Sequence, residues 1–144
     1  MSWLPRKSVV VPVDFSAQSL EAIQTALEFV ESPTHVHVIY VVIPLTTITV
    51  GEAFAVEDVG SRLSASRDFL DNYLKQNAVP GITSEVREGD PGLQIAEYVQ
   101  SVKADLVVMP SHGRHGVQRL LLGSVAERVL RHVECPILIL RRND

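Results

Sequence analysis

The segment from Pro110 to Ser124 carries residue types that suit the binding of a phosphate group. It begins Pro110-Ser111-His112-Gly113, and nine residues then separate Gly113 from Gly123-Ser124. Glycine lets the backbone approach an anion, and the first turn of a helix offers N–H groups that no helical carbonyl accepts. An apolar run ends just before this segment, and a helix-like run, 125–130, follows it. Strand, glycine-containing loop and helix N-terminus together predict an anion or nucleotide site.

The rest of the chain alternates between strand-like and helix-like segments. Buried-type apolar runs predict strands over 8–13, 35–43, 82–87, 105–109 and 136–140. Apolar residues at helical spacing predict helices over 19–30, 61–76, 93–102 and 124–132. Residues 46–60 show no clear period and are expected to form a long loop, and 89–92 are expected to form a turn. This alternation predicts one α/β domain over 1–144, with a parallel sheet covered by helices on both faces.

Three blocks of the chain resemble the universal stress protein family. The family's loop reads glycine, two residues, glycine, nine residues, then glycine with serine or threonine. Gly113 and Gly123-Ser124 match its second and third glycines, while Pro110 stands in the place of the first. The segments 9–16 and 135–140 resemble the family's first and last strands. The resemblance implies a doubly wound, five-stranded sheet of order 3-2-1-4-5, Rossmann-like and of the adenine nucleotide alpha hydrolase type.

That strand order brings two of the similar blocks to one crevice. Ligands of such sheets bind beyond the carboxyl ends of the strands, where the strand order reverses. The reversal would lie between the first strand, ending at Asp14, and the fourth, ending near Pro110. The resemblance implies that ATP or another adenine nucleotide binds there, with Asp14 contacting the ribose hydroxyls and the backbone of Val41 contacting adenine. The predicted binding residues are Pro12, Val13, Asp14, Val41, Pro110, Ser111, His112, Gly113, Arg114, Gly123, Ser124 and Val125.

Several of these residues also have a purely structural interpretation. Ser124 begins Ser-Val-Ala-Glu, so it and Glu127 match a capping box at a helix N-terminus. Asp14 could serve only to complement the positive end of the following helix. Gly113 and Gly123 could be turn and helix-start glycines and nothing more.

The sequence favours binding over catalysis. It contains no Gly-Lys-Ser/Thr of a Walker A loop and no Gly-x-Ser-x-Gly elbow. A hydrolase or nucleotidyl transferase would need a catalytic constellation that these residues do not form, so at most slow ATP hydrolysis is expected. His112 and His115 supply only half of a zinc site, and Cys135 is the one cysteine. No resident metal is predicted, although Mg²⁺ or Mn²⁺ could accompany the nucleotide phosphates.

Composition and charge narrow the classes of partner. The net charge of −4 argues against nucleic acid, which usually binds a basic surface. No apolar run approaches the roughly 20 residues of a membrane helix, and the N-terminus lacks the apolar segment of a signal peptide. We therefore expect a cytoplasmic protein with no membrane partner.

The predicted last strand, 136–140, indicates how the protein could associate with itself. It is short and apolar and should lie at a sheet edge, where unpaired backbone groups invite a second strand. In the family that this chain resembles, the last strand commonly pairs with its own copy, which implies a homodimer. The sequence thus predicts a dimeric regulatory module of the stress response that binds an adenine nucleotide. The alternative, which Pro110 favours, is a dimeric interaction protein of the same fold that binds no nucleotide.

Overall fold

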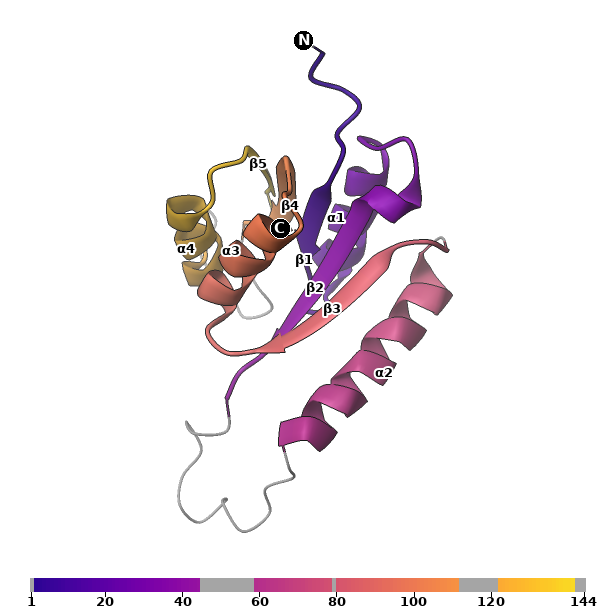
Figure 1. Ribbon diagram of the computed structural model, residues 1–144, viewed down its shortest axis with the longest axis vertical. Helices are drawn as coiled ribbons and strands as arrows, with labels where there is room; N and C mark the ends of the chain where they lie inside the picture. The colour runs from indigo at the N-terminus through magenta and orange to yellow at the C-terminus, as the bar shows by residue number, and fades with distance from the viewer. Residues whose placement is uncertain (1, 45–58, 79, 112–121, 142–144) are drawn as a thin grey trace.

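The computed structural model describes residues 2–44, 59–78, 80–111 and 122–141. Its strands form one parallel sheet in the order β3-β2-β1-β4-β5, which confirms the predicted topology (Figure 1). The strands are β1 (Val9–Pro12), β2 (Val36–Val42), β3 (Thr83–Glu88), β4 (Leu106–Pro110) and β5 (Ile137–Leu140). The helices are α1 (Ala17–Leu27), α2 (Val59–Asn77), α3 (Pro91–Ser101) and α4 (Ser124–His132), with a 3-10 turn at Pro33–His35.

The sheet is buried between two layers of helices. Val9 and Val11 on β1 pack with α1 and α2, while Val10 between them packs with α3 and α4. All three side chains are completely buried, because successive residues of a strand point to opposite faces. This is why the first strand reads as an unbroken apolar run. Figure 1 shows α3 and α4 side by side in one layer.

The predicted turn over 89–92 was wrong in its second half. Asp90 is the N-cap of α3, and its Oδ2 atom accepts a hydrogen bond from the N–H of Leu93 at 3.0 Å. Pro91 then begins the helix, where its missing N–H costs nothing. Composition suggested a turn, whereas the order of aspartate and proline specifies a helix start.

The predicted loop over 46–60 ends earlier than expected. Val59 and Gly60 already belong to α2, and the remainder of the predicted loop lies outside the described residues. In the described part of the chain, no helix is both long and apolar enough to cross a bilayer.

Candidate functional site

The ends of β1 and β4 face each other at the point where the strand order reverses. On β1, the N–H of Val13 donates to the carbonyl of Ile39 on β2 at 2.9 Å. Because backbone groups alternate in direction along a strand, the backbone of Pro12 faces β4. On β4, the N–H of Ser111 donates to the carbonyl of Leu140 on β5 at 2.9 Å, so the backbone of Pro110 faces β1.

Pairing between β1 and β4 stops short of the ends of both strands. It ends at Val10–Val107, whereas β1 pairs with β2 as far as Pro12 and β4 pairs with β5 as far as Pro110. The next two hydrogen bonds of a parallel ladder would need the N–H groups of Pro12 and Pro110. Proline has no N–H, so neither bond can form. These two prolines therefore prevent the hydrogen-bond ladder between the central strands from continuing to the edge where the sequence predicts a ligand.

Asp14, directly beyond β1, is held by the start of α1. Its Oδ1 atom accepts hydrogen bonds from the N–H of Ser16 at 3.0 Å and the hydroxyl of Ser19 at 2.8 Å. The backbone N–H of Asp14 in turn donates to the Ser19 hydroxyl at 2.9 Å. Asp14 thus has the structural role that the sequence left open, and its carboxylate is oriented at the carboxyl edge of the sheet. Ser19 was not among the predicted site residues, although its partner Asp14 lies only five residues before it.

Phe15 adopts a backbone conformation that is unusual for its type. Its φ of +66° lies in the left-handed region, which costs a bulky residue on the order of 1–3 kcal/mol. Its ring is surrounded by three others, with centroids 4.7 Å from Tyr40, 4.8 Å from Phe69 and 5.1 Å from Tyr73. Burial, and then the negative charge of Asp14, raise the pKa of Tyr73, which places this aromatic cluster within electrostatic reach of the carboxylate. The cluster of Phe15, Tyr40, Phe69 and Tyr73 was not foreseen from the sequence.

The N-terminus of α4 meets the end of β4. The N–H of Gly123 donates to the carbonyl of Ser111 at 2.7 Å. Gly123 is the N-cap residue, and the first helical bond runs from the N–H of Glu127 to its carbonyl at 2.9 Å. The N–H groups of Ser124, Val125 and Ala126 precede that bond, so no helical carbonyl accepts them. Such a turn suits an anion.

The capping box predicted for Ser124 and Glu127 was wrong. Ser124 is the first helical residue and not the N-cap, and within the described residues no side chain caps this helix. The hydroxyl of Ser124 is therefore not used in the way that the Ser-Val-Ala-Glu pattern suggested. Ser124 and Val125 remain at the helix end that the sequence assigned to phosphate.

Val41 extends past the point where β1 pairs with β2. That pairing ends at Pro12–Ile39. The carbonyl of Ile39 accepts from β1 and that of Val42 accepts from Gly89 beyond β3, so the backbone groups of Val41 face the β1 side. They point toward the chain that follows β1, which is the direction the predicted adenine contact requires.

The remaining predicted residues divide into two groups. The first group lies at the carboxyl ends of β1 and β4 and consists of Pro12, Val13, Asp14, Pro110, Ser111, Gly123, Ser124 and Val125. His112, Gly113 and Arg114 lie outside the described residues, as does His115 of the half metal site.

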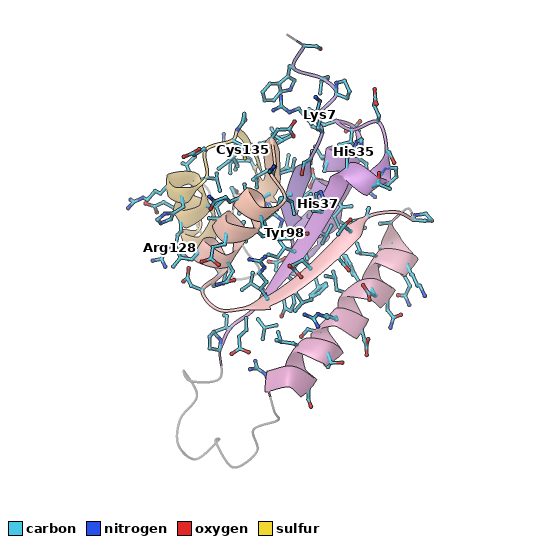
Figure 2. The ribbon with its side chains drawn as sticks, in the orientation of Figure 1. Lys7, His35, His37, Tyr98, Arg128 and Cys135 are labelled. Atoms are coloured by element: carbon cyan, nitrogen blue, oxygen red, sulfur yellow. The ribbon has the colours of Figure 1, made fainter. Side chains whose placement is uncertain are left out.

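Arg128 links α4 to α3 beside this edge. Its Nη1 atom lies 3.0 Å from Oδ1 of Asp90. Its side chain covers Gly92, where an added Cβ would lie 2.6 Å from Cβ of Arg128. Figure 2 shows the Arg128 side chain on the α3–α4 side of the molecule. Neither Asp90 nor Gly92 was recognised from the sequence as part of this support.

Cys135 and Lys7 lie at the other end of the sheet, before β5 and β1 begin (Figure 2). Burial is the main cause that raises the pKa of the Cys135 thiol. A raised thiol pKa makes the thiolate scarce, and the thiolate is the reactive form. Among the residues that the structure describes, no group of three or more His, Cys, Asp or Glu side chains could hold a metal ion.

Comparison with known proteins decides the family. Residues 5–141 match the sequence profile of the universal stress protein family. This chain belongs to the universal stress protein family. The universal stress protein described here is 34% identical over 140 residues to Universal stress protein MJ0531 of Methanocaldococcus jannaschii, covering 94% of this chain and 82% of that protein. It is 26% identical over 148 residues to Universal stress protein Sll1388 of Synechocystis, covering 92% of this chain and 96% of that protein.

Solved structures share the fold of this universal stress protein. The hypothetical protein MJ0577 matches with a TM-score of 0.77 at 23% identity, over 98% of this chain and 99% of that one. A universal stress protein crystallised in complex with cAMP matches with a TM-score of 0.58 at 24% identity, over 95% of this chain and 98% of that one. At these identities the structures establish the doubly wound, Rossmann-like fold.

Proposed function

We propose that this universal stress protein binds an adenine nucleotide, such as ATP, between the carboxyl ends of β1 and β4. The observation that carries the proposal is that the pairing of these strands ends at Val10–Val107, before Pro12 and Pro110, while the start of α4 is hydrogen-bonded to the end of β4. A helix N-terminus, which suits an anion, and the Asp14 carboxylate therefore follow the carboxyl ends of these two strands. The structure of a universal stress protein of the same fold in complex with cAMP supports an adenine ligand.

In this proposal the phosphates bind at the first turn of α4. The N–H groups of Ser124 and Val125 would donate to phosphate oxygens, with the Ser124 hydroxyl beside them. Two favourable terms act together, because the N–H groups are direct donors and the helix dipole attracts negative charge. The residues of the preceding loop, His112, Gly113 and Arg114, would complete this part of the site. Mg²⁺ or Mn²⁺ would arrive with the phosphates, which supply the oxygen ligands that these ions prefer.

The nucleoside would lie on the β1 side of this site. Pro12 and Val13 would line the adenine, and the backbone of Val41 would hydrogen-bond to it. The Asp14 carboxylate would accept hydrogen bonds from the two ribose hydroxyls. The hydrogen bonds from Ser16 and Ser19 to its Oδ1 atom orient this carboxylate before a ligand arrives.

The proposed role is that of a regulatory module of the stress response, acting as a homodimer. We assign it binding and at most slow ATP hydrolysis. The dimer would form through β5, whose four residues are only partly buried at the edge of the sheet. An edge strand of this kind can pair with a second copy.

Calorimetric titration of ATP with Mg²⁺ tests the nucleotide site. Wild-type protein should bind in the micromolar range, and Ser124→Pro should weaken binding about tenfold, the effect of roughly one to two lost hydrogen bonds. Proline suits this position, because it is the first helical residue and Gly123 already has the extended conformation, φ −66° and ψ 161°, that proline requires before it.

Ser124→Ala is the matched control for the backbone contribution. It removes the hydroxyl and keeps the N–H, so the difference between the two variants isolates the N–H donor. The absence of both heat and thermal shift in the wild type would refute nucleotide binding and favour the dimeric interaction protein. Equal binding by wild type and Ser124→Pro would remove α4 from the site.

A further inference from the structure

Ser19 holds Asp14 through a reciprocal pair of hydrogen bonds. The Ser19 hydroxyl donates to Oδ1 of Asp14 at 2.8 Å and accepts from the Asp14 N–H at 2.9 Å. A hydroxyl has one donor and two acceptor positions, so the single proton of this hydroxyl is committed to the carboxylate. Ser19 is only 1% exposed and lies in the first turn of α1. The backbone and the side chain of Asp14 are therefore both fixed relative to a buried point of the fold.

Phe15, the next residue in the chain, constrains the backbone beside this carboxylate. Its left-handed backbone, φ +66°, turns the chain between Asp14 and α1. Contacts with Tyr40 on β2 and with Phe69 and Tyr73 on α2 keep the ring, and hence this backbone, in place. Strained conformations of this kind persist where the surrounding structure over-determines them, and they are concentrated at functional sites.

We propose that Ser19 and Phe15 are positioning residues, which present the Asp14 carboxylate to the two hydroxyls of a nucleotide ribose. This inference rests on the proposed function and adds a specificity: ligands with an intact 2′,3′-diol are preferred over those without it. A flexible carboxylate would lose rotamer freedom on binding, whereas this one is ordered beforehand. The chain thus supports the ribose contact with a serine from α1 and an aromatic cluster that reaches α2.

Two nucleotides separate a positioning role from a general structural one. ATP and 2′,3′-dideoxy-ATP share adenine and phosphates and differ only at the diol. We expect the wild type to bind ATP at least fivefold more tightly than the dideoxy compound in calorimetry with Mg²⁺. Ser19→Ala should weaken ATP binding about fivefold and leave the dideoxy affinity within twofold. A loss of fold or of helix position would weaken both ligands alike.

Ser8→Ala is the matched control. Ser8 is also a buried serine, 9% exposed, and its hydroxyl donates to the carbonyl of Val102 at 3.1 Å, before β1 begins. Its loss should leave the ratio of the two affinities unchanged. Phe69→Ala is a second test of the positioning role. Phe69 is 59% exposed, so removing its ring should leave the fold intact. By loosening the Phe15 ring, it should reduce ATP affinity twofold to threefold and not the dideoxy affinity.

The outcomes distinguish the two levels of the proposal. A wild type that binds both nucleotides equally, or a Ser19→Ala variant that loses both equally, overturns the positioning role and leaves nucleotide binding intact. A wild type that binds neither nucleotide overturns the proposed function itself. Selective loss of ATP affinity in Ser19→Ala and Phe69→Ala, with Ser8→Ala unaffected, supports both.

Discussion

Pro12 at the end of β1 and Pro110 at the end of β4 both direct their backbones to the boundary between the two strands, and neither can donate the hydrogen bond that would extend the ladder. The pairing of the two strands ends at Val10–Val107 for this reason. Both strands continue beyond that point beside their other neighbours. Two prolines far apart in the chain thus determine where the hydrogen bonding between β1 and β4 ends. Pro110, which stands where the family's loop has a glycine, is one of the two residues that prevent this pairing from continuing.

Pro110→Ala should extend the ladder by one hydrogen bond. The alanine N–H would face β1 and donate to the carbonyl of Pro12. A new hydrogen bond contributes about 0.5–1.5 kcal/mol, and loss of proline costs about 0.4–1 kcal/mol through the entropy of the unfolded chain, so stability should change little. Hydrogen exchange of the residue 110 amide is the decisive measurement. We expect protection close to that of Ser111, whose N–H is already bonded to Leu140; rapid exchange would show that the strands stay apart without the proline.

Gly92→Ala should destabilise the contact between α3 and α4. The added Cβ would lie 2.6 Å from both Cβ and Cγ of Arg128, and the former cannot move without the helix. Overpacking of this kind costs about 1–3 kcal/mol, more than alanine gains over glycine in a helix. Urea unfolding should show this loss. Gly60→Ala is the matched control, because Gly60 is also the second residue of its helix but is exposed, so it should be neutral or slightly stabilising.

Asp90→Ala should lower the free energy of unfolding by about 0.5–2 kcal/mol at neutral pH, as expected for the loss of an N-cap. The hydrogen bond from Leu93, and then the pairing with Arg128, lower the pKa of Asp90 below its ordinary 3.8. A carboxyl whose pKa is lower in the folded state stabilises the protein above the unfolded-state value and loses this effect as the pH falls through the folded-state value. The difference in unfolding free energy between wild type and variant, measured by urea titration, should therefore be largest at pH 6–7 and shrink below pH 3.8. A difference in unfolding free energy between wild type and Asp90→Ala that stays constant down to pH 3 would contradict the assignment.

Local sequence rules were sufficient for some elements and not for others. The bounds of α4 were predicted to the residue, because its apolar spacing and its start after Gly123 are local signals. The strand order came from the family resemblance and was confirmed. The start of α3 was predicted two residues too late, because Gly89-Asp90-Pro91-Gly92 has the composition of a turn, whereas Asp90-Pro91 is also a helix-start signal. The roles of Phe15 and Gly92 depend on residues far away in the sequence, so no local pattern indicates them. Ser19 bonds to Asp14 only five residues earlier, but this spacing matches none of the motifs used for prediction.

Ile139→Pro should abolish the proposed dimer while leaving the domain folded. The carbonyls of Pro136 and Leu140 accept from Val107 at 3.0 Å and from Ser111 at 2.9 Å on β4. Alternation along the strand then places the N–H and carbonyl of Ile139 on the open edge, where a second copy of β5 would pair. Proline removes that N–H without breaking a bond to β4, and edge strands tolerate proline. Light scattering should report the mass of one chain for Ile139→Pro and of two for Ile139→Ala, which keeps the N–H and so serves as the control for side-chain loss. If the proline variant keeps the dimer mass, the two chains do not associate through this edge.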